Sequence, residues 1–161
     1  MRTVMFAAVL ALVASPALAQ TLRLIGPRGQ AVTLTAADLA SLPSVKFTFD
    51  AHGQKHDYEG PLLIDLLAKV GAPTGKALGG KALAHVVLVT SADGYRVALG
   101  LAEADPGTRP NRIIVADRAD GQPLSGNEGP FKLVIEGDLR PARAARMVTD
   151  VRVIALAESA P

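Results

Sequence analysis

The sequence contains no cysteine and no tryptophan. Without cysteine the chain forms no disulfide bond, and it has no thiolate that could act as a nucleophile or bind a metal ion. Aromatic side chains are also scarce, with two tyrosines and four phenylalanines. Only Tyr58 and Tyr95 are therefore good candidates for stacking on a flat ligand, because Phe47, Phe49 and Phe131 fit a core better.

Neither sign of charge is in large excess. The 17 lysines and arginines nearly balance 15 acidic residues, for a formal net charge of +2. This balance argues against nucleic acid or an anionic membrane as the partner. The sequence also has no glycine motif of the phosphate-binding kind and no indication of a serine hydrolase.

The first 19 residues have the form of a cleavable export signal. Arg2 is followed by an apolar stretch at 4–13 and by the small-x-small pattern of Ala17 to Ala19. We expect cleavage after Ala19, which would leave a domain of residues 20–161 in the periplasm with no membrane insertion. The apolar stretch is too short for a membrane anchor, and no twin-arginine pair precedes it.

Periodic apolar segments predict a domain with more strand than helix. The predicted strands are 21–25, 31–34, 45–49, 84–90, 95–99, 113–116, 131–135 and 151–156. We expect Thr35 to cap a short helix over 36–40 and Pro61 to begin a longer one that Gly71 ends. Asp50, His52, His56 and Asp57 are typical of the edge of a polar loop, although Asp50 and His52 would face the same side if the strand of 45–49 continued. The sum is a single mixed-sheet α+β domain.

Four segments, in this order, resemble the oxidoreductase molybdopterin-binding domain, which is the catalytic-domain fold of sulfite oxidases. They are Tyr58–Leu67, Ser91–Tyr95, Gly121–Leu124 and Gly129–Val134. The resemblance extends over nearly the whole chain after the signal. It implies the sulfite oxidase type of fold and a pocket for a pterin or a molybdopterin-like ligand.

One departure from that family changes the expected chemistry. In the family a cysteine ahead of the Gly-Pro-Leu helix holds molybdenum, whereas the corresponding stretch here, 47–53, has none. The resemblance therefore implies a retained fold without the redox metal, and we expect no molybdenum. Small periplasmic proteins of this kind are associated with binding free pterins and reporting them to a membrane-bound enzyme that makes or degrades cyclic di-GMP. We expect that function here, without catalysis.

A pterin-binding pocket needs an acceptor for the ring N–H groups and a flat side chain for stacking. Asp93 and Tyr95 could supply both, although Asp93-Gly94 is also a strong hairpin turn. Tyr58 could lie on the pocket rim or pack against the start of the helix. His52 occupies the neighbourhood of the missing thiolate and could donate a hydrogen bond to a ligand.

Three arginines complete the predicted ligand site. The resemblance places Arg140, Arg143 and Arg146 in a late pocket-lining loop, where their donor forks would meet the polar tail of the ligand. The same residues could instead form a solvated basic loop.

Other interpretations of the sequence stay open. Asp50, His52, His56 and Asp57 could hold zinc or copper, but their spacing matches no metal motif, so we predict no metal site. A molybdopterin-dependent oxidoreductase with atypical metal ligation is a second possibility. A ligand-free protein-interaction module is a third.

Overall fold

The computed structural model describes residues 20–156, and the predicted export signal lies outside them. Strand residues exceed helical residues in this part of the chain, which confirms the predicted α+β class. None of the helices in the described part is both long and apolar enough to cross a membrane.

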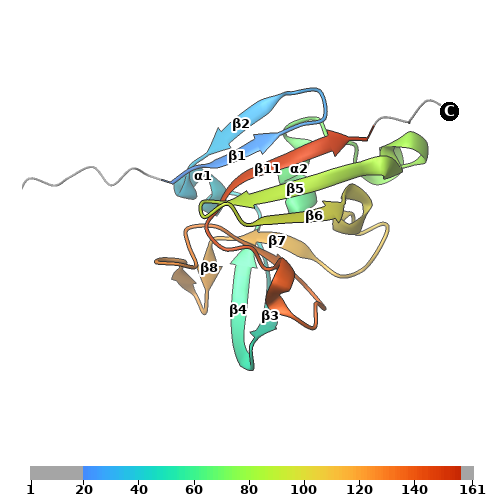
Figure 1. Ribbon diagram of the computed structural model, residues 1–161. Coiled ribbons are helices and arrows are strands. Elements are labelled where there is room, and N and C mark those ends of the chain that lie inside the picture. Colours follow the sequence, from blue (N-terminus) through green and yellow to red (C-terminus); the bar gives the residue numbers. More distant parts are fainter. Residues whose placement is uncertain (1–19, 157–161) are drawn as a thin grey trace, which may run out of the picture.

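The largest sheet is a mixed sheet of five strands. In spatial order it contains β2 (Ala31–Leu34), β1 (Leu22–Ile25), β11 (Val148–Ala155), β5 (His85–Ser91) and β6 (Arg96–Gly100). β1 and β11 are parallel, and the other neighbours are antiparallel. The last strand of the chain therefore lies in the middle of this sheet, between β1 and β5 (Figure 1).

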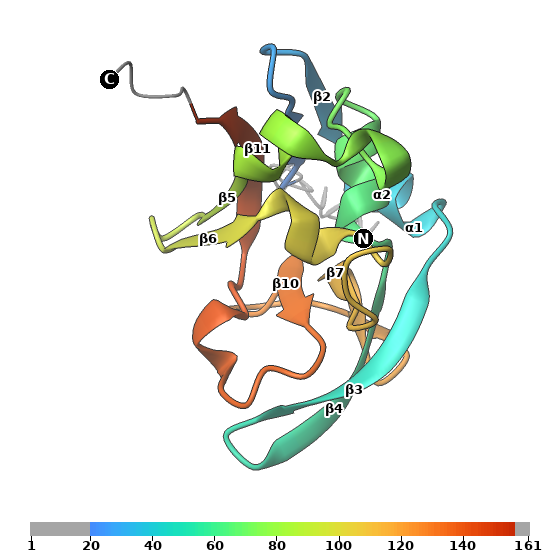
Figure 2. The ribbon, with the colours of Figure 1, turned by 90° about the vertical axis from the view of Figure 1, so that its right-hand side faces the viewer.

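The remaining strands form two smaller sheets. One pairs β7 (Ile113–Ala116) with β10 (Lys132–Ile135), and the other contains β3 (Val45–Ala51), β4 (Gln54–Gly60), β8 (Arg118–Ala119) and β9 (Gln122–Pro123). The β3–β4 hairpin projects away from the five-stranded sheet (Figure 1). Its tip and the segment between β10 and β11 lie at the same end of the molecule (Figure 2).

Helices are short. They are α1 (Ala36–Ala40), α2 (Leu63–Ala68) and the 3₁₀ turns η1 (Gly75–Ala77), η2 (Gly80–Ala84), η3 (Leu101–Ala104) and η4 (Pro141–Arg143). The predicted cap of α1 is confirmed, because Thr35 and Asp38 bond each other's backbone N–H groups in a capping box.

Helix α2 begins later than the sequence predicted. Its first residue is Leu63, after the N-cap Leu62, and Pro61 is not helical. The Pro61 carbonyl accepts a hydrogen bond from the Val115 N–H at 3.1 Å, and Leu62 forms a β-bridge with Ile114. The backbone before α2 is thus held by β7, and the expectation that Pro61 opens the helix was wrong.

The polar stretch predicted as a loop is a strand hairpin. β4 pairs with β3 along its whole length, and His52 and Gly53 form the two-residue turn with φ values of 59° and 80°. Positive φ at both central residues suits such a turn. The strand escaped prediction because only Tyr58 and Gly60 in it are buried, while polar cross-strand pairs such as Thr48–Asp57 replace apolar alternation.

The β7–β10 pair separates two apolar clusters. On one side the five-stranded sheet and α2 pack against Ile113, Val115, Leu133 and Ile135. On the other side lies a cluster formed by Phe47, Phe49, Tyr58, Ile114, Ala116 and Val134. Every residue of β7 and β10 is buried, so both faces of this small sheet are interior.

The close approach of β4 to β7 depends on Gly60. A Cβ atom at Gly60 would lie 2.1 Å from the Val115 carbonyl oxygen, which forces the backbones apart. We expect Gly60→Ala to lower the free energy of unfolding by about 2 kcal/mol or more, measured by urea denaturation. Gly79→Ala is the control, since a Cβ there meets no atom within 4 Å. Equal effects of the two substitutions would contradict this packing argument.

Candidate functional site

A cleft of about 970 Å³ opens at the end of the molecule where the β3–β4 hairpin tip meets the β10–β11 segment. This volume is at the upper end of the range of small-molecule sites. The cleft is lined by Asp50, Ala51, His52, Gly53, Ser91, Asp93, Tyr95, Glu128, Lys132, Asp138, Leu139, Arg140, Pro141, Ala142, Ala144, Ala145 and Arg146. It therefore brings together five of the seven predicted site residues: His52, Asp93, Tyr95, Arg140 and Arg146.

His52 reaches the cleft from the turn of the β3–β4 hairpin. The Oδ1 atom of Asp50 accepts a hydrogen bond from the Gly53 N–H at 2.7 Å, which fixes the turn. His52 lines both the large cleft and a smaller adjoining pocket of about 350 Å³.

Asp93 and Tyr95 line the cleft from the turn between β5 and β6. Oδ1 of Asp93 accepts from the Tyr95 N–H at 2.9 Å, as expected of the predicted turn between β5 and β6. The Tyr95 hydroxyl donates to the Ala142 carbonyl oxygen at 2.5 Å, and 49% of the residue is exposed. A half-exposed ring in a fixed orientation is suited to stacking on a flat ligand.

The three predicted arginines have different environments. Arg140 and Arg146 line the cleft, whereas Arg143 does not. The Arg143 guanidinium binds Asp138 at 2.7 and 3.0 Å and Glu103 at 3.2 Å, and these carboxylates raise its pKa above the ordinary value. Arg143 thus holds the segment between β10 and β11 in place.

Tyr58 is buried and does not lie on the rim of the large cleft. It is 3% exposed, does not line the large cleft, and forms one wall of the smaller pocket. Its ring packs edge-on against Phe49, with 6.3 Å between ring centroids. Its hydroxyl accepts a hydrogen bond from Nζ of Lys132 at 2.8 Å.

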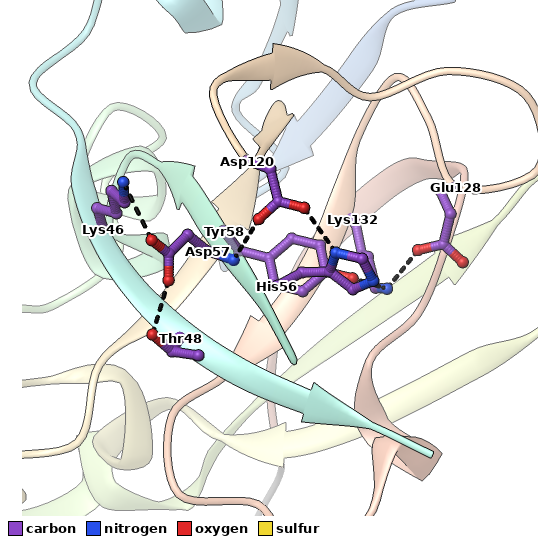
Figure 3. Close-up of polar contacts among 8 residues, drawn as sticks. All are labelled: Lys46, Thr48, His56, Asp57, Tyr58, Asp120, Glu128 and Lys132. Carbon is purple, nitrogen blue, oxygen red and sulfur yellow. Dashed lines mark hydrogen bonds and ion pairs between the residues drawn. The ribbon is translucent and has the colours of Figure 1, made fainter. Parts of the chain in front are cut away.

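The sequence did not identify Lys132 and Glu128, which are paired between the two cavities (Figure 3). Lys132 follows Phe131 in a strand pattern, where a lysine would ordinarily face solvent. Here β10 is buried on both faces, so Lys132 points toward Tyr58 with its Nζ 4.6 Å from the ring centroid. A lysine inside the apolar segment 131–135 was the sequence feature that could have indicated a buried polar site.

Ser91 adds a polar atom without a partner. It lies at the end of β5, is 3% exposed, and lines the cleft. Its Oγ is the one buried side-chain polar atom among residues 20–156 that makes no hydrogen bond to the protein. Such an atom is costly to bury unless a ligand or water satisfies it.

Three of the four residues considered for zinc or copper make hydrogen bonds in the hairpin or beside it, namely Asp50, His56 and Asp57. Asp57 binds Thr48 and Lys46, and both contacts lower its pKa (Figure 3). Nδ1 of His56 donates to Oδ2 of Asp120 at 2.7 Å, and this bond lowers the pKa of Asp120. No group of three or more candidate ligands in the described part of the chain is placed to hold a metal ion.

The donor set of the cleft fits an organic ring system better than molybdenum. The chain has no thiolate, and the carboxylate and imidazole groups lining the cleft are not soft ligands. Carboxylates, the exposed Tyr95 ring, the Ser91 hydroxyl and two arginines are groups that bind a flat, polar heterocycle.

The two tyrosines provide a matched test of the buried contact. We expect Tyr58→Phe to lower the free energy of unfolding by about 1–3 kcal/mol, because the Lys132 ammonium loses a buried acceptor. Tyr95→Phe also removes a hydroxyl, but at a half-exposed residue, and should cost less than about 1 kcal/mol. Denaturant unfolding at pH 7 measures the free energy of unfolding of both variants. A larger decrease for Tyr95→Phe than for Tyr58→Phe would contradict the buried hydrogen bond between Tyr58 and Lys132.

Comparison with known proteins gives a match in fold. No family model and no curated protein sequence matches the chain, whereas 27 chains of solved structures do. One is the sulfane dehydrogenase SoxCD from Paracoccus pantotrophus, at a TM-score of 0.65 and 15% sequence identity. The match covers 85% of this chain and 38% of the dehydrogenase chain. The chain therefore shares its fold with this dehydrogenase, which agrees with the fold that the sequence motifs implied.

Proposed function

We propose that this chain is a periplasmic pterin-binding protein without catalytic activity, which reports its occupancy to a membrane-bound enzyme of cyclic di-GMP metabolism. The observation that carries the proposal is the cleft between the β3–β4 hairpin and the β10–β11 segment. It combines hydrogen-bond acceptors, an exposed aromatic ring and arginines around one volume of small-molecule size.

The groups on the β5–β6 side match the edge and the flat face of a pterin ring. The ring edge of a pterin carries amino and N–H donors, and Asp93 presents a carboxylate to the cleft. Tyr95 offers its half-exposed ring for stacking. Ser91 Oγ lies within the same wall and needs a hydrogen-bond partner.

The absence of a thiolate supports binding rather than redox catalysis. The sulfite oxidase family, which the motifs resemble, uses a cysteine to hold its metal, and this chain has no cysteine. An oxidoreductase with atypical ligation would have to hold its metal without the cysteine that the family uses.

The lip of the cleft offers a surface that a partner protein could contact. Leu139 is 99% exposed, lines the cleft, and adjoins Arg140 on the same segment. A partner that covered this leucine would lie directly over a bound ligand, so its affinity would depend on occupancy. The export signal predicted in residues 1–19 supports a periplasmic meeting place.

Calorimetry with the purified protein tests the proposal directly. We expect a reduced or oxidised pterin to bind with micromolar or tighter affinity. Asp93→Ala should weaken that binding by about 10- to 100-fold, since hydrogen bonds to a charged group contribute about 1.5–3 kcal/mol. Asp65→Ala, an exposed carboxylate of α2 outside the cleft, is the control. No binding heat with any pterin would refute the proposal and favour a ligand-free interaction module.

Elemental analysis distinguishes this function from that of a molybdenum enzyme. Protein taken from its native compartment should contain no stoichiometric molybdenum, because no thiolate is present to complete the coordination. Mass spectrometry of the same preparation should instead detect a bound pterin. One molybdenum atom per chain would contradict the proposed pterin-binding function and favour a molybdenum oxidoreductase.

A further inference from the structure

Glu128 places a carboxylate between two cations of the cleft. One oxygen, Oε2, contacts Nζ of Lys132, and the other, Oε1, lies 3.5 Å from Nη1 of Arg146 (Figure 3 shows the lysine contact). All three residues line the cleft. An internal carboxylate thus occupies the position in which a ligand anion would meet both cations.

Lys132 makes this arrangement necessary. Its side chain is only 4% exposed, and its other polar contact is the neutral hydroxyl of Tyr58. A buried ammonium group without an anionic partner is strongly unfavourable. Some anion must therefore stay next to Nζ, and in this structure Glu128 supplies it.

The two partners differ in how firmly they are held. Lys132 begins the buried strand β10, whereas Glu128 lies in the loop before it, with 34% of its side chain exposed. The loop turns through Gly126, at φ 59°, and the Glu128 N–H bonds the Ser125 carbonyl oxygen at 3.2 Å. Glu128 can move toward solvent at less cost than Lys132 can, since Lys132 is part of the core packing.

We infer that Lys132 and Arg146 form an anion subsite of this cleft and that Glu128, by filling it, determines ligand specificity. Glu128 favours ligands that are uncharged where they meet this subsite and disfavours ligands carrying a phosphate group there. The identification of the ligand as a pterin rests on the proposed function, whereas the anion subsite itself does not. Arg140, which is exposed, also lines the cleft and makes no hydrogen bond to the other described residues, so it adds a third positive charge to the cleft.

Inorganic phosphate is the probe for the subsite. Glu128→Gln keeps the shape of the side chain and removes its charge, so Lys132 and Arg146 lose their internal anion. We expect this variant to bind phosphate at least tenfold more tightly than the unmodified protein, by calorimetry at constant ionic strength. Its melting temperature should be lower in chloride and should recover by several degrees in phosphate, while the unmodified protein shows little difference between the two buffers.

Two controls separate the subsite from a general charge effect. Asp138→Asn removes one negative charge from the same cleft, but the partner of Asp138 is Arg143, which lies outside the cleft and keeps Glu103. It should gain no phosphate binding. The double variant Glu128→Gln with Lys132→Met removes the buried charge together with its partner, and it should lose the phosphate affinity that the single variant gained.

Ligand selectivity gives the second measurement. We expect the unmodified protein to prefer neopterin to neopterin triphosphate and Glu128→Gln to shift that ratio at least tenfold toward the triphosphate. If no pterin binds while the phosphate effect is present, the proposed function fails and the anion subsite stands. If Glu128→Gln gains no phosphate binding, gains no more than Asp138→Asn, or fails to refold in chloride and phosphate alike, the inference is overturned.

Discussion

A positive charge inside the protein needs a negative partner, and this requirement organises the interior beside the cleft. Lys132 lies on a strand that is buried on both faces, with Tyr58 from β4 on one side and Glu128 from the preceding loop on the other. These contacts join the β3–β4 hairpin to the β7–β10 pair. Lys132 and Glu128 line both cavities, so this part of the interior is held by an ion pair as well as by apolar packing.

Most of the fold could be predicted from local pattern, and the failures have physical causes. Alternating or continuous apolar segments located the strands of the large sheet and of the β7–β10 pair. β4 was missed because polar cross-strand pairs stabilise it. Helix α2 starts late because its preceding residues bond to β7, a contact between segments about 50 residues apart in sequence that no local pattern reveals.

The candidate site was predictable to the extent that its residues lie in turns. Asp93 and Tyr95 belong to the predicted turn between β5 and β6, where a short sequence determines both conformation and exposure, whereas His52 was inferred from the family resemblance. Tyr58 could not be placed, because its partner Lys132 is distant in sequence, and Arg143 is held by Asp138 as well as by the distant Glu103. The sulfane dehydrogenase shares the fold that carries the cleft, and the cleft residues of this chain include no thiolate.

The central position of β11 has a consequence for biogenesis. Because β1 and β5 each pair with β11 and not with each other, the part of the chain that precedes Val148 emerges from the ribosome with two unsatisfied strand edges. Pairings of such large sequence separation also form slowly. The five-stranded sheet is therefore completed only after β11 has been synthesised, and until then β1 and β5 lack the strand that lies between them.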